Sequence, residues 1–394
     1  MTHKHNSRLF LLCFLGILSA FGPFVMDMYL PTLPSMVDYF HTSSSMVQLG
    51  LTGSMVGLAL GQLLFGPLSD RYGRRTPLLV AMLLFLASTV GCIYADNIFQ
   101  FVVLRFFQGV AGAGGVVISR SIATDEYSGH QLAGVLAVIG GINGIATVAA
   151  PIGGGMLAHL SGWQGIFWFL FAVGLLLLLG NVRFCESLPV ARRHQMGWKD
   201  FMFRFKDVLG NRRYLCYILQ YGFTLAVLFV NIASAPFIMQ QHYGLSPFFF
   251  SFCFGLNSVA MILASAVSVK LPSMERALYL GSRGMLVVSI LLFLALSYRC
   301  AFWLYELLVF ALLSMVGMAF TASSTLAMDC ERQNAGVASA LLGAVGFAFG
   351  GLVSPLVGIG SLMISAGLLF VSSSVCVYVC NRYMWERTAQ AFEV

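Results

Sequence analysis

The sequence predicts an all-α polytopic membrane protein, with twelve transmembrane helices arranged as two six-helix bundles. The first observation is composition: 59% of the 394 residues are hydrophobic and 9% are charged, whereas a soluble domain carries about 25% charged residues. The second is the length of the apolar runs, since about 20 residues cross the roughly 30 Å core of a bilayer. Third, these runs lack the strict alternation of a transmembrane β-barrel. Lipid is therefore the expected outer solvent.

The apolar runs define the twelve spans in order. The first is too long for a cleavable signal peptide, and Asp27 followed by Pro31 suits a retained helix. The shortest connection falls near residues 358–360. The expected spans are 9–33, 45–68, 77–95, 98–119, 131–158, 163–182, 213–239, 246–269, 278–297, 302–327, 335–357 and 361–381.

The distribution of basic residues predicts the orientation of these spans. With the N-terminus inside, 20 of the 22 Lys and Arg residues fall in cytoplasmic segments, as the positive-inside rule requires. We therefore expect a multi-pass protein of the inner (cytoplasmic) membrane with both termini in the cytoplasm. The net charge of +7 follows from this topology, and no nucleic-acid partner is expected.

Residues 183–212 form the long polar stretch of the sequence, with six spans before it and six after it. Such a plan is typical of transporters built from two repeated halves. We therefore expect an N-terminal bundle over 1–182, a cytoplasmic linker over 183–212 and a C-terminal bundle over 213–394. The linker is interpreted as a tether on the anionic inner leaflet, with a regulatory or partner site as the alternative.

Two ionisable residues lie well inside the spans, where a charge costs about 2.5–3.5 kcal/mol. Asp27 is interpreted as a proton or substrate site, because its ionised form loses most on leaving water; the alternative is an ion pair or a helix cap. Arg105 stays charged and is expected to modulate the protonation of Asp27, or else to tie helices through backbone carbonyls. Gln108, one turn on, shares that surface. Glu306 is expected to reach the membrane interface, with a place in the cavity as the alternative.

Neutral polar and aromatic side chains within the spans are candidates for the cavity wall. Asn143, Asn231 and Asn257 each either bind a substrate or join two helices. The candidates for substrate contact are Asp27, Tyr29, Gln108, Asn143, Tyr221, Phe223 and Asn257.

Residues 66–75, the basic turn, separate two uncharged apolar runs. Their sequence is Gly66-Pro-Leu-Ser-Asp70-Arg71-Tyr-Gly73-Arg74-Arg75. A short basic turn between two spans marks the cytoplasmic side and is a candidate moving part.

Four motifs resemble one family. The basic turn resembles the loop 2–3 signature of the major facilitator superfamily, and Arg105-Phe-Phe-Gln108-Gly109 resembles the span 4 motif of its proton-coupled members. Ala150-Pro151-Ile-Gly153-Gly154-Gly155 resembles the span 5 antiporter motif, with Ala150 in place of a glycine. Asp27-Met-Tyr-Leu-Pro31 is similar to the span 1 motif of the Bcr/CflA (bicyclomycin/chloramphenicol-resistance) branch of drug/proton antiporters.

The resemblance implies two six-helix bundles, a central cavity and alternating access. It implies that Asp70 and the neighbouring arginines clamp the cytoplasmic side, and Arg120 is a further partner for Asp70. It also implies that Pro151, Gly153 and Gly154 bend span 5 and limit leak. The expected cytoplasmic gate comprises Gly66, Asp70, Arg71, Gly73, Arg74, Arg75 and Arg120.

The function expected from these residues is proton-coupled export of a drug-like or small amphipathic molecule. Nothing indicates an enzyme, and no Gly-Lys-Ser/Thr loop follows a strand to bind ATP. The proton gradient is the expected energy source, with no cofactor, in a monomer whose partners are the substrate, protons and lipid. The alternatives are a proton-linked importer of a nutrient and a membrane sensor or scaffold without flux.

Overall fold

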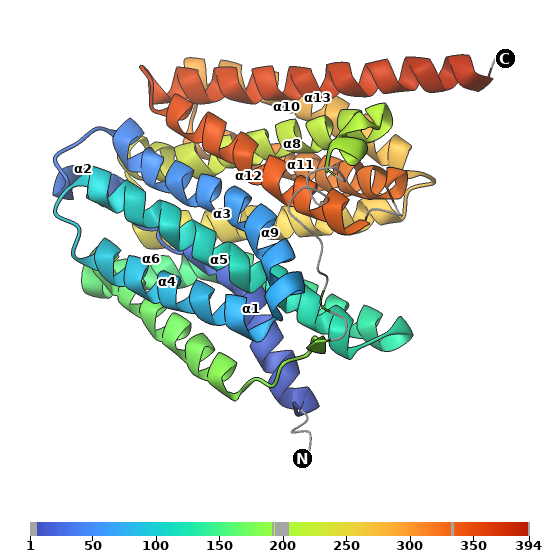
Figure 1. Cartoon of the computed structure of the whole chain (residues 1–394). Helices are drawn as coiled ribbons and strands as arrows, with labels where there is room; N and C mark the ends of the chain where they lie inside the picture. The colour runs from blue at the N-terminus through green and yellow to red at the C-terminus, as the bar shows by residue number, and fades with distance from the viewer. Residues whose placement is uncertain (1–5, 191–192, 194–204, 332–334, 393–394) are drawn as a thin grey trace. The chain divides into compact units, whose positions relative to one another are not determined.

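The computed structural model describes residues 6–190, 193, 205–331 and 335–392, and the regular elements in this part of the chain are helical. The chain divides into two compact units (Figure 1). Unit 1 comprises Met1–Thr42 and Leu49–Phe201, and unit 2 comprises Ser43–Gln48 and Met202–Val394. The assignment of 183–212 to a linker stays a prediction, because 191–192 and 194–204 lie outside the described residues.

Unit 1 is built from long apolar helices, and side-chain caps fix the starts of two of them, α1 and α5. Ser7 accepts a hydrogen bond from the backbone N–H of Phe10, and Asn97 accepts one from Gln100; both satisfy N–H groups that a first turn leaves unpaired. The elements are α1 (Arg8–Asp27), the 3₁₀ turn η1 (Leu30–Thr32), α2 (Leu33–Tyr39), α3 (Ser44–Tyr72), α4 (Arg75–Ile93), α5 (Ile98–Glu126) and α6 (Gly129–Arg183).

Two expected spans, 131–158 and 163–182, form the single element α6. Gly162 interrupts it with φ 66° and ψ −170°, a conformation open essentially to glycine alone. Eleven helical segments in the described residues are long and apolar enough to cross a membrane, and one of them, Gly134–Arg183, has 50 residues. A straight helix of that length would measure about 75 Å, more than twice the bilayer core. This segment therefore holds two spans.

Glycines set the close packing between α3 and α5. Gly53, Gly57 and Gly61 recur every fourth residue on α3, and a Cβ added at any of them would meet the backbone of α5. Gly109 on α5 faces the backbone of Ser54 in the same way. This is the small-residue packing by which membrane helices approach closely. The remaining core of unit 1 comes from α1 and α4, which both pack against α5 and α6.

Unit 2 is arranged around α8, which packs against α11, α12 and α13. Helix α11 also packs against α9 and α10. The elements are α8 (Arg212–Phe237), the π-helical turn η3 (Ile238–His242), α9 (Pro247–Val269), α10 (Met274–Ser297), α11 (Phe302–Cys330), α12 (Ala335–Val357) and α13 (Leu362–Phe392).

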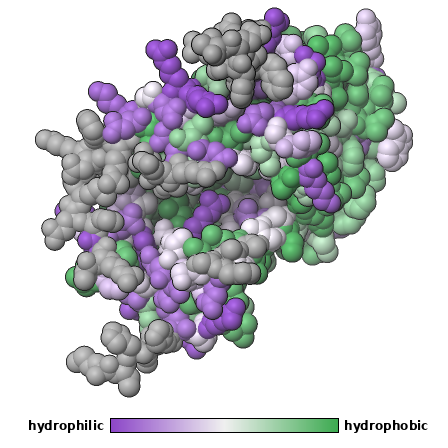
Figure 2. All heavy atoms as spheres, turned by 90° about the vertical axis from the view of Figure 1, so that its right-hand side faces the viewer, coloured by the Kyte–Doolittle hydropathy of each residue, from purple (hydrophilic) through white to green (hydrophobic). Residues whose placement is uncertain are grey.

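The helix surfaces confirm the predicted polytopic membrane protein. Large apolar side chains are exposed along the spans in both units, as Phe99, Ile145, Leu263 and Leu307 illustrate. Figure 2 shows one face on which hydrophilic residues gather, with hydrophobic residues covering the adjoining side. Exposed apolar surface on this scale is expected where lipid is the solvent.

Candidate functional site

Asp27 is the last residue of α1, and it is buried with 7% of its surface exposed. Its carboxylate has no hydrogen bond or ion pair within the described part of the chain; the three ion pairs found there involve other residues. A buried carboxyl without a counter-charge is costly in its ionised form. The position therefore favours a group that exchanges its proton or binds a ligand.

Arg105 on α5 reaches the end of α1 without forming an ion pair. It is fully buried, and its Nη2 donates to the backbone carbonyl of Val25 at 2.9 Å. The last carbonyls of a helix lack intrahelical partners, so the guanidinium caps the turn that ends at Asp27 and complements the negative end of the helix dipole. The structure thus brings Arg105 and Asp27 to the same helix end through the backbone.

A chain of hydrogen bonds continues from Arg105 to α4. Arg105 Nη1 donates to Gln108 Oε1, Gln108 Nε2 donates to Thr89 Oγ1 at 2.8 Å, and Thr89 donates to the Phe85 carbonyl at 2.7 Å. Because arginine can only donate, it fixes the orientation of the Gln108 amide, and each later bond follows from it. The network joins α1, α5 and α4 around one fixed positive charge.

Tyr29 packs its ring against the same guanidinium. The ring centroid lies 4.2 Å from Arg105 Cζ, and that of Phe167 on α6 lies 5.8 Å from it. Such cation–π contacts are worth about 2 kcal/mol or more when desolvated. The Tyr29 hydroxyl is buried and has no hydrogen-bond partner among the described residues. Tyr29 therefore belongs to the Arg105 cluster and keeps a free polar atom.

The glycines of the span 5 motif lie against the residue that follows Asp27. A Cβ added at Gly154 would collide with the carbonyl oxygen of Met28, and one added at Gly153 would touch the Met28 side chain at 3.7 Å. Pro151 is buried on the same helix. Asn143 lies apart from this contact, because eleven residues along α6 correspond to about 16 Å. The structure therefore gathers Asp27, Tyr29, Arg105, Gln108 and Gly154 but leaves out Asn143.

The other predicted substrate residues belong to unit 2. Tyr221 on α8 packs on Phe320 of α11, with ring centroids 5.3 Å apart, and Phe223 packs on Phe349 of α12 at 4.8 Å. Asn257 is buried on α9 and donates from Nδ2 to Glu306 Oε1 at 2.9 Å.

Glu306 is buried and binds Asn257, as its alternative place inside the protein requires. It lies on the inner side of α11, packed against α9, with 8% of its surface exposed. That its side chain reaches the membrane interface stays a prediction, because the expectation used the distance of Glu306 from the helix end and the structure describes the face on which it lies.

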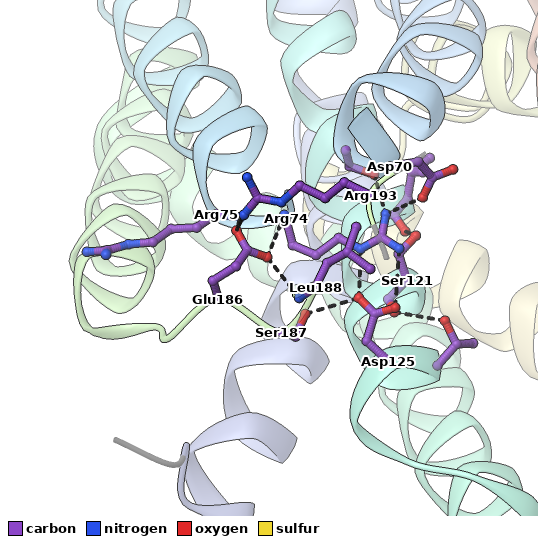
Figure 3. A network of polar contacts seen from close by, with 12 residues as sticks. Asp70, Arg74, Arg75, Ser121, Asp125, Glu186, Ser187, Leu188 and Arg193 are labelled. Carbon is purple, nitrogen blue, oxygen red and sulfur yellow. Dashed lines mark hydrogen bonds and ion pairs between the residues drawn. The ribbon is translucent and has the colours of Figure 1, made fainter. Parts of the chain in front are cut away.

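The basic turn is bound to the ends of α5 and α6 (Figure 3). Buried Arg74 donates from Nη1 to Asp70 at 2.5 Å and to Ser69 at 2.8 Å, and from Nε to Asp125 at 2.8 Å. Burial alone would lower the pKa of the Arg74 guanidinium, but the hydrogen bonds to Asp125 and Asp70 outweigh it and raise the pKa. Arg74 therefore stays charged and holds two acidic residues together.

Glu186, just beyond α6, binds the backbone of the basic turn. Its carboxylate accepts from the N–H of Arg74 at 2.8 Å and of Arg75 at 3.2 Å. Gly73 makes this possible, since it has φ 87° and an added Cβ would collide with Glu186. Arg75 in turn donates from Nη2 to the carbonyl of Val182 at 2.7 Å. The turn is thus anchored to unit 1 through α6.

Arg120, Arg71 and Gly66 take no part in this network. The expected contact of Arg120 with Asp70 is not present: Asp70 pairs with Arg74, and no ion pair of Arg120 occurs among the residues described. Arg71 is exposed, with Cζ 5.4 Å from the ring of Tyr72. A Cβ added at Gly66 would have no neighbouring atom within 4 Å.

Sequence reasoning missed three residues of these networks: Asp125, Glu186 and Thr89. The first two carried a usable signal, because an acid on the predicted cytoplasmic side, close to a basic turn, is a candidate partner for an arginine. Thr89 carried none, since one hydroxyl in an apolar span is common and usually bonds its own helix.

Comparisons with known proteins identify the family to which this fold belongs. A model of the Major Facilitator Superfamily matches residues 12–355. The MFS-type transporter YdgK of Bacillus subtilis (strain 168) is 36% identical over 361 residues, covering 90% of each chain. A bicyclomycin resistance protein homolog of Haemophilus influenzae is 29% identical over 406 residues, covering 96% of each. A bacterial homolog of the human lysosomal transporter Spinster has a TM-score of 0.74 at 16% identity, covering 96% of this chain and 98% of its own.

Proposed function

The chain belongs to the major facilitator superfamily, and from this premise we propose that it is a proton-coupled exporter of small amphipathic, drug-like molecules. Membership makes the chain a multi-pass membrane transporter and not an enzyme. The name of the H. influenzae relative refers to bicyclomycin resistance. Together with the Asp27–Pro31 motif, it supports the Bcr/CflA branch of drug/proton antiporters.

The observation that carries the proposal is the burial of Asp27 without an ion pair. Such a carboxyl is stable when it holds a proton or when it binds a cationic or hydrogen-bond-donating group of a substrate. The two occupants exclude each other at one carboxyl. Binding of substrate from the cytoplasm and of a proton from outside then gives exchange by alternating access.

Arg105 is a positioning residue in this proposal. Its charge is held by the Val25 carbonyl and by Gln108, and it stays constant at any relevant pH. It fixes the helix end that carries Asp27 and leaves the carboxylate itself free. The unpaired hydroxyl of Tyr29 is the nearby polar atom that a substrate would meet.

One proton per cycle supplies enough energy for useful export. Entry across 100 mV yields about 2.3 kcal/mol, and one pH unit adds about 1.4 kcal/mol. The sum of about 3.7 kcal/mol sustains a gradient of about 500-fold for a neutral solute. The energy source is thus the proton gradient, and no cofactor is needed.

The basic turn acts as the cytoplasmic gate in this proposal. Arg74 and Glu186 anchor it to unit 1, while half-exposed Asp70 and exposed Arg71 are the charges that remain accessible for a changing contact. We place the monomer in the inner membrane with both termini in the cytoplasm, from the asymmetry of its basic residues.

The test is transport by the purified chain in proteoliposomes with an imposed pH gradient. Bicyclomycin, chloramphenicol and a lipophilic dye serve as probes, and proton release is recorded together with probe flux. Asp27→Asn should abolish uphill transport, whereas Asp38→Asn, the same change at an exposed residue of α2, should leave it intact. Undiminished uphill transport with proton coupling in Asp27→Asn would show the mechanism to be wrong.

Whole-cell accumulation of the dye tests the direction of transport. An exporter lowers the internal dye relative to cells that carry Asp27→Asn. Higher internal dye in cells with the unaltered chain would favour the importer, and no substrate-dependent proton movement would favour a sensor without flux.

A further inference from the structure

We propose that Glu306 is a second proton-binding site, formed as a carboxyl–amide pair with Asn257 inside unit 2 and independent of Asp27. That Glu306 binds a proton is inferred from the geometry of unit 2 alone. That this proton is coupled to substrate transport rests on the proposed function.

The pair consists of one hydrogen bond and two unpaired atoms. Asn257 Nδ2 donates to Glu306 Oε1 at 2.9 Å, and both residues are more than nine-tenths buried. Glu306 Oε2 and Asn257 Oδ1 are buried and have no hydrogen-bond partner in the described part of the chain. Each residue therefore presents one satisfied and one unsatisfied polar atom.

One proton gives both unpaired oxygens, Glu306 Oε2 and Asn257 Oδ1, a hydrogen-bond partner. Ionised glutamate only accepts hydrogen bonds, and the amide oxygen also only accepts, so neither unpaired oxygen can serve the other. Protonation of Glu306 Oε2 creates the missing donor. The acceptor Oδ1 is within reach, because it belongs to the same Asn257 amide whose Nδ2 already binds Glu306 Oε1. The acid and the amide can then pair through two hydrogen bonds, an arrangement that the ionised acid cannot form.

Among the described residues of unit 2, no cation contacts the Glu306 carboxylate to compensate its ionised form. The titratable groups in electrostatic contact with Glu306 are Tyr305 on its own helix and Cys253 on α9; Tyr243 and Cys300 lie next to Tyr305. Tyrosine and cysteine side chains carry no positive charge in either protonation state. His242 and Arg299, at this end of the unit, are exposed. Helix α12 has no charged side chain. The other charged side chains of the helices packed around Glu306 lie towards the opposite end of unit 2, and they are Arg212, Arg213, Lys270, Glu275, Arg276, Arg283 and Asp329.

The site is close to the surface that would supply the proton. Glu306 follows the N-cap residue of α11, Ala301, by five positions, which corresponds to about 7.5 Å along the axis. The loop before it exposes Tyr298 and Arg299, and Tyr243 donates to the Cys300 carbonyl at 2.9 Å. A proton from the α10–α11 loop therefore crosses less than two helical turns to reach the carboxyl.

In transport, a second carboxyl would raise the gradient that the exporter can sustain. If both Asp27 and Glu306 release a proton in each cycle, the limiting solute gradient becomes the square of the one-proton value. The number of protons per substrate is then two, and it falls to one when Glu306 is lost, whereas loss of Asp27 abolishes uphill transport as proposed above.

The test is pH-difference infrared spectroscopy of the full chain in proteoliposomes. Glu306→Gln keeps the shape of the side chain and cannot titrate. Glu331→Gln is the matched control, because Glu331 ends the same helix and also accepts from an asparagine, Asn211, at 2.7 Å. The spectrum of the unaltered chain should contain the C=O stretch of a protonated carboxyl. The component of this band that comes from Glu306 should vanish in Glu306→Gln, together with one titrating proton per chain, while the component from Asp27 remains. Both components should persist in Glu331→Gln.

Asn257→Leu should shift this band to higher frequency, because the carboxyl oxygen loses its hydrogen-bond donor. An unchanged band and an unchanged proton count in Glu306→Gln would overturn the proposal. Asp27→Asn should leave the Glu306 band in place even if the proposed transport mechanism fails, so the two failures are distinguishable. A proton-to-substrate ratio that stays the same in Glu306→Gln would overturn its part in coupling.

Discussion

Gly154 offers a sharp test of the packing around Asp27, because its neighbour is backbone and cannot rotate away. In Gly154→Ala the added Cβ would collide with the Met28 carbonyl oxygen and lie 2.7 Å from its carbonyl carbon. Overpacking of this kind costs about 1–3 kcal/mol. Gly140→Ala, on the same helix, has no atom within 4 Å of the added Cβ and gains about 1 kcal/mol of helix propensity. Comparing the two variants therefore separates the effect of the collision with Met28 from the effect of alanine on helix propensity.

The expected result is a lower unfolding temperature and slower transport for Gly154→Ala only. If its collision displaces Met28 and with it the Asp27 carboxyl, a cost of about 1–3 kcal/mol corresponds to a roughly 5- to 140-fold loss of pH-driven flux. Thermal unfolding in detergent and flux in proteoliposomes measure the two effects. Equal stability and equal flux in both variants would refute the close contact between α6 and the end of α1.

Three further substitutions test the two polar networks. Arg74→Ala should destabilise the protein by about 2–4 kcal/mol, because it leaves the partly buried Asp125 unpaired and removes the ion pair with half-exposed Asp70. The control Arg71→Ala, at an exposed residue, should change stability by less than about 0.5 kcal/mol. Asp70→Asn, at a side chain that is 47% exposed, should cost less than about 1 kcal/mol and slow transport with substrate binding nearly intact; an equal loss of binding would mean a scaffold and not a gate. Gln108→Leu should cost about 1–3 kcal/mol, because Arg105 Nη1 loses its buried acceptor, and an unchanged unfolding temperature would contradict this network.

The sequence predicts the spans well and the partners of their polar residues poorly. Hydropathy is local, so each apolar run can be recognised from about 20 neighbouring residues. Partner choice is not local: Arg74 meets Asp125 across 51 residues, and Asn257 meets Glu306 across 49. Composition and motifs placed Asp27 in the first span and Arg105 in the fourth, but only the folded chain shows that the arginine binds a backbone carbonyl and not the acid.

The break at Gly162 has a consequence for the biogenesis of the protein. With one left-handed residue between them, the two parts of α6 have no polar linker that would let them insert at separate times. Residues 157–166 carry no Asp, Glu, Lys or Arg, so the bend itself can cross the bilayer without moving a permanent charge. The two spans should enter the membrane together as a preformed hairpin, and their insertion should depend on the backbone of one residue.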